Sequence, residues 1–300
     1  MCEDWIFFLT AKETELQYTI AQILRYKHES AQFVLLFLIQ VLYKTGFMWY
    51  NIKDSMMQGG GGVRLDKMLS ECGLASRKET ARAVRAGQVT VNGVAAKRAD
   101  MQVDPATDAV TFCGKPVCYR KYVYIMLNKP DGYVSATEDG RAPTVVELLP
   151  EEYRKMELFP CGRLDKHTLG LMLLTNDGQL SHRLLSPRHH VPKSYAFRVK
   201  FPLSEQDVTA LEAGVDIGGY VTKPCTVSLS GEREGIISIT EGKYHQIKLM
   251  MEAVHNQITY LERRTFGPLS LDPMLSRGEW RELTDGEITA LSEQSSTTIL

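Results

Sequence analysis

An arginine and an aspartate close together in the stretch Gly162-Arg163-Leu164-Asp165 are the residues of this sequence best suited to chemistry. Shortly after them, the run from Leu169 to Leu174 contains five large apolar residues, one glycine and no charge. Such a run predicts a core strand covered on both faces. A carboxylate at the entrance of a rigid strand is fixed in position, as a catalytic group must be. The alternative is a surface Arg/Asp pair in a loop, which contributes little to stability.

A tyrosine and a lysine further along the chain could act beside this carboxylate. Tyr195 lies in residues 193–201, whose alternation predicts a strand. Lys248 lies near the start of a predicted helix, off the centre of its apolar face. Taken alone, Tyr195 is better interpreted as a core aromatic residue and Lys248 as a solvated side chain. The predicted strand turns Tyr195, Phe197, Val199 and Phe201 to one side, and the apolar helix face consists of Ile247, Met250, Met251 and Val254.

Metal and cofactor chemistry have little support in the sequence. Adjacent histidines at His189 and His190 suggest a metal, but no carboxylate or third ligand follows at matching spacing. The six cysteines are scattered and none forms a C-x-x-C pair, which favours reduced thiols in a cytoplasmic protein. There is no glycine-rich nucleotide loop. We therefore expect neither a metal nor a cofactor.

The elements that must position these residues belong to a chain of 300 residues, enough for about two domains. Its apolar fraction of 44% and charged fraction of 24% are those of an ordinary globular protein. The net charge of −1 does not by itself indicate a polyanionic partner, so the local distribution of charge has to decide.

Residues 1–62 differ from the rest and are predicted to be an extension that forms no domain. Their uncharged stretch from Ala31 to Tyr43 has 13 residues, too few to span a bilayer. Acidic residues near the N-terminus argue against a signal peptide. Four glycines precede Val63, and glycine codons are guanine-rich, as a ribosome-binding site is. Our hypothesis is that the natural start lies at Val63 or Met57; a buried or interfacial helix is the alternative.

Residues 63–118 form a small module with local basic character. Ser76 and Glu79 have the spacing of a capping box and predict a helix running to about residue 86. A short strand and a tight turn at Asn92-Gly93 are predicted next. On charge alone, an RNA-binding face and a solvated helix face are equally good interpretations. One face of the predicted helix carries three cations, Lys78, Arg82 and Arg85, with no acid between them.

Several motifs together resemble one enzyme family. The string Arg64-Leu65-Asp66-Lys67, with Ser76-Arg77 and Val89-x-Val91-Asn92-Gly93, resembles an S4 RNA-binding domain. The stretch from Gly162 to Asp165 resembles the catalytic motif of the pseudouridine synthases that carry such a domain. Within that family the similarity is to the RsuA-like enzymes of small-subunit 16S ribosomal RNA, and it covers residues 63 to about 292. Further matching stretches are Leu127–Val134 (including Lys129, with a mainly structural role), Lys193–Tyr195, Gly242–Lys248 and Gly267–Leu283.

The resemblance implies an α+β fold, with an S4 domain over residues 63–118 and a catalytic domain over residues 121–292. The catalytic domain would be built on a mixed, largely antiparallel sheet flanked by helices. Asp165 would be the catalytic carboxylate acting on a flipped-out uridine, and Tyr195 would be a second catalytic residue that stacks on the uracil or protonates it. Lys248 would pair with Asp165 and keep it ionised, at a site where relatives often have arginine with its bidentate fork. Substrate contacts are expected from Arg163, Arg188, His189, His245 and Gln246, and RNA contacts of the S4 domain from Arg64, Lys67, Arg77, Lys78, Arg82 and Arg85.

The implied reaction breaks the N1–C1′ bond of a uridine, rotates the base and rejoins it through C5. Asp165 could attack the nucleoside covalently or act as a base on the ribose, and the sequence does not decide between them. The favoured substrate is 16S ribosomal RNA, as for the uridine-516 type of enzyme. The stretches Ser186–His190 and Tyr244–Gln246 favour the small-subunit RNA as the substrate. Two alternatives stay open: a 23S ribosomal RNA substrate, and a ribosome assembly factor that only binds RNA. We expect ribosomal RNA as the partner, a monomer, and no membrane.

Overall fold

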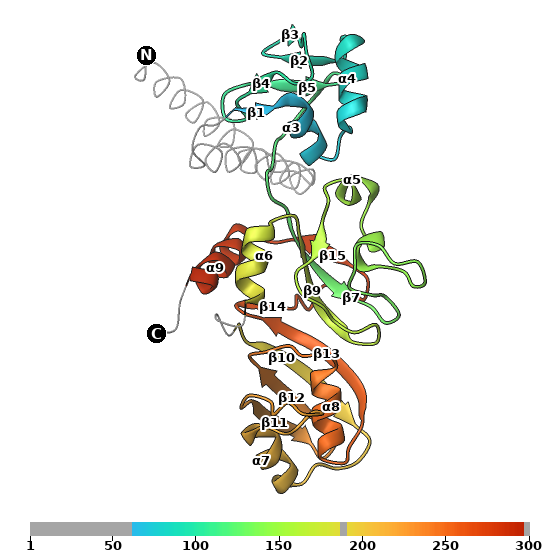
Figure 1. Cartoon of the computed structure of the whole chain (residues 1–300), viewed down its shortest axis with the longest axis vertical. Coiled ribbons are helices and arrows are strands. Elements are labelled where there is room, and N and C mark those ends of the chain that lie inside the picture. The colour runs from blue at the N-terminus through green and yellow to red at the C-terminus, as the bar shows by residue number, and fades with distance from the viewer. Residues whose placement is uncertain (1–61, 187–190, 297–300) are drawn as a thin grey trace, which may run out of the picture. The chain divides into compact units, whose positions relative to one another are not determined.

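The computed structural model describes residues 62–186 and 191–296. The predicted N-terminal extension lies outside the described residues apart from Gly62, as do the predicted substrate-binding residues Arg188 and His189. Strands before residue 118 and strands after residue 123 belong to separate sheets (Figure 1). No helix of the described ranges is both long and apolar enough to cross a membrane.

The N-terminal described elements form two small antiparallel sheets and a pair of contacting helices. One sheet has the strand order β3-β2-β5-β6, and the other pairs β1 with β4. In chain order these elements are β1 (Val63–Arg64), α3 (Leu65–Glu71), α4 (Arg77–Arg85), β2 (Val89–Val91), β3 (Val94–Ala95), β4 (Gln102–Val103), β5 (Val110–Phe112) and β6 (Lys115–Pro116).

Short-range sequence signals account for the second helix and for the hairpin in this part. The Ser76 hydroxyl accepts from the Glu79 N–H at 3.3 Å, and the Glu79 carboxylate accepts from the Ser76 N–H at 2.8 Å. This capping box starts α4 where it was predicted. Asn92 and Gly93 have φ of +53° and +77°, as the tight turn between β2 and β3 requires. The core beneath includes Leu65, Met68, Leu69, Ala83, Val84, Val89, Val103 and Val110.

The C-terminal described elements are organised around one larger sheet. It has the path β11-β12-β10-β13-β9-β7-β15, with β14 added to β13 and β8 added to β9. All pairs are antiparallel except β13 with β9, so the predicted mixed, largely antiparallel sheet is confirmed. The strands are β7 (Tyr124–Lys129), β8 (Phe159–Pro160), β9 (Leu169–Thr175), β10 (Lys193–Val199), β11 (Thr226–Gly231), β12 (Glu234–Ile239), β13 (Ile258–Phe266), β14 (Leu269–Ser270) and β15 (Trp280–Glu282).

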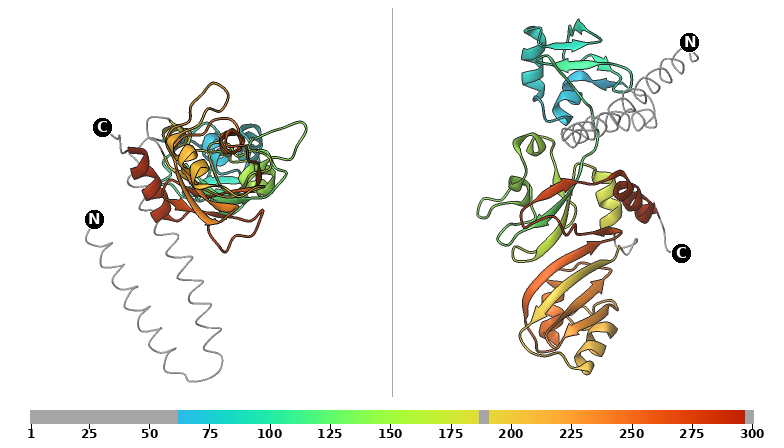
Figure 2. Two further views of the ribbon diagram at one scale, coloured as in Figure 1. Left: turned by 90° about the horizontal axis from the view of Figure 1, so that it is seen from below. Right: turned by 180° about the vertical axis from the view of Figure 1, so that it is seen from behind.

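Strand β9 lies between two hydrophobic cores, which is why its sequence carries no charge. Leu171 and Leu173 belong to one core and Met172 and Leu174 to the other, as the alternation of a strand requires. Helices α6 and α9 contribute to the first core and lie side by side in Figures 1 and 2. Helices α7 and α8 contribute to the second. The helices are η1 (Val145–Leu148), α5 (Glu151–Arg154), α6 (Gly178–Leu185), α7 (Glu205–Ala213), α8 (Gln246–Ala253) and α9 (Asp285–Ser296).

Helix α6 begins at a capping aspartate, while some apolar side chains, among them Phe201 and Leu185, lie outside the core. The Asp177 carboxylate caps α6 by accepting from the Leu180 N–H at 2.9 Å. Phe201 was expected on the buried face of β10, but its side chain is 52% exposed. The strand ends at Val199 after a register shift, so the alternation does not continue to residue 201. Leu185, the last residue of α6, is also largely exposed.

Candidate active site

Asp165 lies in the loop 161–168, between β8 and β9, and hydrogen bonds from the segment after β7 hold this loop. The Ser135 hydroxyl donates to the Leu164 carbonyl at 2.8 Å and accepts from the Leu164 N–H at 3.0 Å. The Leu164 side chain is itself buried in the core. On the other side of the aspartate, the Gly132 N–H donates to the Lys166 carbonyl at 3.1 Å. The backbone is therefore fixed both before and after Asp165.

Lys129, at the end of β7, supports the same loop from the interior. Its side chain is fully buried, and its ammonium donates to three carbonyl oxygens. These belong to Pro130 at 3.1 Å, Lys166 at 3.0 Å and Thr168 at 2.9 Å. They match the three donors of an ammonium group. Burial lowers the pKa of Lys129 to about 8. The lysine thus connects β7 to the backbone on the C-terminal side of the aspartate.

Two basic side chains at the start of α8 approach the carboxylate of Asp165. The Lys248 Nζ lies 2.7 Å from Oδ2, the distance of a charge-assisted hydrogen bond. The His245 Nε2 lies 3.6 Å from Oδ1. The Asp165 and Lys248 side chains are 25% and 27% exposed, so the pair is enclosed by protein yet still reachable. The ion pair expected from the sequence is therefore present in the structure.

Tyr195 lies on β10 and points into the core that also contains the neighbours of the ion pair. Its side chain packs in one cluster with Leu164, which precedes the aspartate, and Ile247, which precedes the lysine. The residue is only 7% exposed. Within the described part of the chain, its hydroxyl makes no hydrogen bond. Tyr195 therefore combines the position of a core aromatic with a hydroxyl that no described residue engages.

The remaining predicted substrate-binding residues have different surroundings. Arg163 is exposed and forms no ion pair with any described residue. Gln246 is 3% exposed, and its amide is engaged inside the protein. Its oxygen accepts from the Lys243 N–H at 2.9 Å, and its nitrogen donates to Glu241 at 2.7 Å. Gln246 thus supports the turn that leads into α8, and a direct contact with substrate stays a prediction.

The six cations predicted to bind RNA in the N-terminal module divide into two groups. Arg64 pairs with Asp66 at 2.7 Å, and Lys67 lies 3.6 Å from Glu71. The other four are exposed and form no ion pair among the residues that the structure describes. They are therefore available for phosphate groups. These four are Arg77, Lys78, Arg82 and Arg85.

Two supports of the site were not identified as such from the sequence. Ser135 carries no recognisable motif, because its partner Leu164 is 29 residues away and meets it only in the folded chain. Lys129 lies in a motif of the sequence, but its three carbonyl partners could not be deduced from that motif. Both residues hold backbone atoms of the loop rather than the carboxylate of Asp165.

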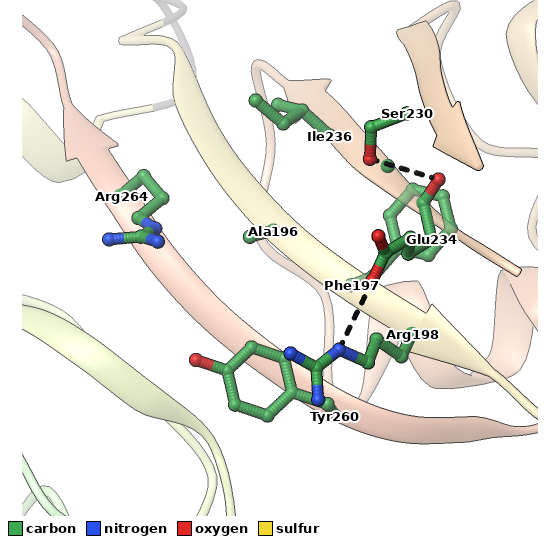
Figure 3. Close-up of a pocket in the computed structure, with 9 residues that line it drawn as sticks. Ala196, Phe197, Arg198, Ser230, Glu234, Ile236, Tyr260 and Arg264 are labelled. Carbon is green, nitrogen blue, oxygen red and sulfur yellow. Dashed lines mark hydrogen bonds and ion pairs between the residues drawn. The ribbon is translucent and has the colours of Figure 1, made fainter.

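A hollow of about 280 Å³ on the sheet is separate from this site (Figure 3). Ala196 and Arg198 line it, and both alternate along β10 with Tyr195. The guanidinium of Arg198 lies over the ring of Tyr260 at 5.0 Å and pairs with Glu234 at 3.3 Å. Arg198 thus already has a carboxylate partner within the protein. No three His, Cys, Asp or Glu side chains of the described ranges gather as metal ligands.

Comparison with known proteins identifies the family to which this fold and this site belong. The family model described as RNA pseudouridylate synthase matches residues 123–253, and the S4 domain model matches residues 63–109. The chain belongs to the RNA pseudouridine synthases, isomerases that act on RNA, and it carries an S4 domain.

The similarity to individual relatives covers nearly the whole length of each relative. The chain is 52% identical over 236 residues to an uncharacterized RNA pseudouridine synthase, YtzG, of Bacillus subtilis, covering 77% of this chain and 99% of that protein. It is 38% identical to ribosomal small subunit pseudouridine synthase A of Escherichia coli K12, covering 76% of this chain and 100% of that protein. A crystal structure of a pseudouridylate synthase matches with a TM-score of 0.54 at 34% identity, covering 76% of this chain and 99% of that one.

Proposed function

We propose that this enzyme converts one uridine of small-subunit 16S ribosomal RNA to pseudouridine, with Asp165 as the catalytic carboxylate. The observation that carries the proposal is the 2.7 Å ion pair between Lys248 and Asp165, in a loop whose backbone is held on both sides. The relatives named ribosomal small subunit pseudouridine synthase A support the choice of RNA. Uridine 516 is the proposed position.

The proposed mechanism needs an ionised carboxylate in a fixed place, whichever atom of the nucleoside it attacks. Lys248 holds the Asp165 carboxylate in place by a charge-assisted hydrogen bond of 2.7 Å, and the start of α8 also brings His245 to within 3.6 Å of it. A carboxylate that is rigid before the substrate arrives loses little entropy in the reaction. Either covalent attack or proton removal from the ribose uses this same arrangement.

The other residues of the proposal bind and orient the RNA. Tyr195 would pack against the uracil of the flipped nucleotide and offer its unpartnered hydroxyl to it. Arg163, exposed beside Asp165, would contact a phosphate group of the same strand. The free cations of the S4 domain, proposed to span residues 63–118, would dock the enzyme on structured RNA through its backbone. The catalytic domain proposed for residues 121–292 would then select the uridine.

The proposal is tested by mapping pseudouridine in ribosomal RNA with carbodiimide modification and primer extension. A strain that lacks the gene is supplied with the wild type, with Asp165→Ala, or with the control Glu252→Gln. Glu252 is an exposed acid on α8 that makes no ion pair among the described residues. We expect one 16S site to return with the wild type and the control but not with Asp165→Ala.

Each other result contradicts a defined part of the proposal. A site that returns in 23S ribosomal RNA would give the enzyme a different substrate. A site restored by Asp165→Ala would remove the aspartate from its catalytic role. If the wild type restores no site although the purified protein binds ribosomal RNA, the chain acts as a binding factor and the enzymatic proposal is wrong.

A further inference from the structure

The most exposed aromatic ring of the described catalytic part lies one residue from the active-site histidine. The Tyr244 side chain is 75% exposed, although aromatic rings are among the side chains that gain most from burial. Its ring stacks on that of His245, with centroids 3.9 Å apart and an interplanar angle of 19°. The tyrosine hydroxyl makes no hydrogen bond with any described residue. The ring is thus presented to solvent beside its one stacking partner among the described aromatic residues.

This ring pair lies directly against the catalytic site. The His245 Nε2 is 3.6 Å from the carboxylate of Asp165, so the imidazole ring of the stacked pair contacts the proposed reaction centre. His245 also has φ of +51° and ψ of +26°, the left-handed conformation that non-glycine residues seldom adopt. That backbone conformation turns the chain sharply before α8 begins. Strain of this kind persists where the surrounding structure holds it.

The turn that carries the rings is rigid because one carboxylate holds it from several directions. Glu241 accepts from the Tyr220 hydroxyl at 2.7 Å, from the Lys223 N–H at 3.0 Å and from the Gln246 amide at 2.7 Å. Gln246 in turn accepts from the N–H of Lys243. Tyr244 is therefore an exposed ring on a fixed backbone, so a ligand that stacks on it meets a surface that is already ordered.

We propose that Tyr244 and His245 form a stacking platform for the nucleobase next to the flipped uridine, a subsite that rests on the proposed function. A flat base is the ligand that a solvent-exposed ring parallel to a second ring is suited to accept. The charge of the region agrees with RNA, because Lys243 lies in the same turn, 4.2 Å above the Tyr220 ring, and Lys248 lies in the first turn of α8. A backbone phosphate beside the platform would meet positive charge.

The platform also has an energetic role in the proposed reaction. Flipping a uridine out of its stack removes stacking from the base beside it, which costs free energy. A protein ring placed against that neighbouring base replaces the lost contact. Tyr244 would therefore favour the extruded arrangement of the RNA, and it would do so through binding rather than through the chemical step. It is a substrate-binding residue, and His245 supports its ring.

The test compares Tyr244→Leu and Tyr244→Phe with the wild type on a 16S transcript that contains the uridine identified by mapping. Release of tritium from 5-³H-uridine in the transcript gives KM and kcat. We expect Tyr244→Leu to raise KM about 5- to 100-fold, the usual effect of removing one base stack, with kcat changed much less. Tyr244→Phe keeps the ring and should stay within about twofold of the wild type. Phe201→Leu, at another exposed aromatic, is the matched control and should leave both constants unchanged.

A binding measurement locates the stacked base. In the inactive Asp165→Asn background, 2-aminopurine placed beside the target uridine should lose fluorescence on binding, and the added Tyr244→Leu change should abolish that loss. If Tyr244→Leu has wild-type KM and the same fluorescence loss, the platform is wrong while the proposed function stands. If the wild type forms no pseudouridine in any ribosomal RNA, the proposed function fails, and the platform with it. Unchanged melting temperatures exclude misfolding.

Discussion

Replacing Lys248 by methionine tests the centre of the proposed mechanism, because methionine keeps the length of the side chain and removes its charge. The Lys248 Nζ lies 2.7 Å from Asp165 Oδ2, and both side chains are about a quarter exposed. A hydrogen bond between charged groups contributes about 1.5–3 kcal/mol, and partial exposure places this pair at about 2 kcal/mol. If that energy acts in the transition state, kcat/KM should fall about 30-fold. Lys248→Arg keeps the charge and should lose about threefold or less.

The assay is tritium release from 5-³H-uridine in 16S ribosomal RNA at limiting substrate, which reports kcat/KM. Lys200→Met is the matched control, since Lys200 is an exposed lysine of the same domain that has no carboxylate partner among the described residues. The reasoning is refuted if Lys248→Met retains more than about a third of the wild-type kcat/KM. It is refuted equally if Lys248→Arg is as impaired as Lys248→Met, because charge would then not be the decisive property.

Three further predictions concern the supports of the site and the docking of RNA. Burial lowers the pKa of Lys129 from 10.5 to about 8, so between these values the unfolded chain holds a proton that the folded one has lost. The free energy of unfolding should therefore gain up to about 3 kcal/mol as pH rises from 8 to 10.5, and urea denaturation should show that Lys129→Met lacks this gain. Gly170→Ala should destabilise the fold by about 2–4 kcal/mol, because φ at Gly170 is +96° and the new Cβ would lie 2.3 Å from a carbonyl oxygen of β13. The control Gly178→Ala has open space around the new Cβ and should not destabilise the fold. Thermal melts compare the two variants. Changing Arg82 and Arg85 together to glutamate should weaken RNA binding and lower the slope of log affinity against log salt by about 2 in a filter-binding titration; an unaltered slope would contradict the docking role.

The sequence predicted the parts of this fold that depend on neighbouring residues. The uncharged run that became β9 was recognised because a strand covered on both faces has no polar side. The capped start of α4 followed from the spacing of Ser76 and Glu79. Asp165 and Lys248 were predicted as partners only through the resemblance, since they lie 83 positions apart in the chain. Spacing alone left both as ordinary surface residues.

Contacts made only in the folded chain could not be predicted. The hydrogen bonds of the Gln246 amide within its own turn could not be deduced from the order of residues, and its contact with substrate stays a prediction. Tyr244 was noted only as part of a motif. Its proposed role in base stacking depends on the exposure of its ring and on the contact of that ring with His245, and neither can be predicted from the sequence. Phe201 fitted the alternation of β10, but a register shift ends that alternation first.

Lys129 and Ser135 hold the loop that carries Asp165, and the way they do so affects how this enzyme can evolve. Both donate hydrogen bonds to backbone carbonyl oxygens, which every amino acid possesses. The side chains of Lys166 and His167, by contrast, are exposed beside the aspartate. Substitution at those two positions would change the exposed surface beside Asp165 and leave the hydrogen bonds to the loop backbone available. In the proposed function, selection for a new target sequence can therefore act on the side chains around the site while the carboxylate stays in place.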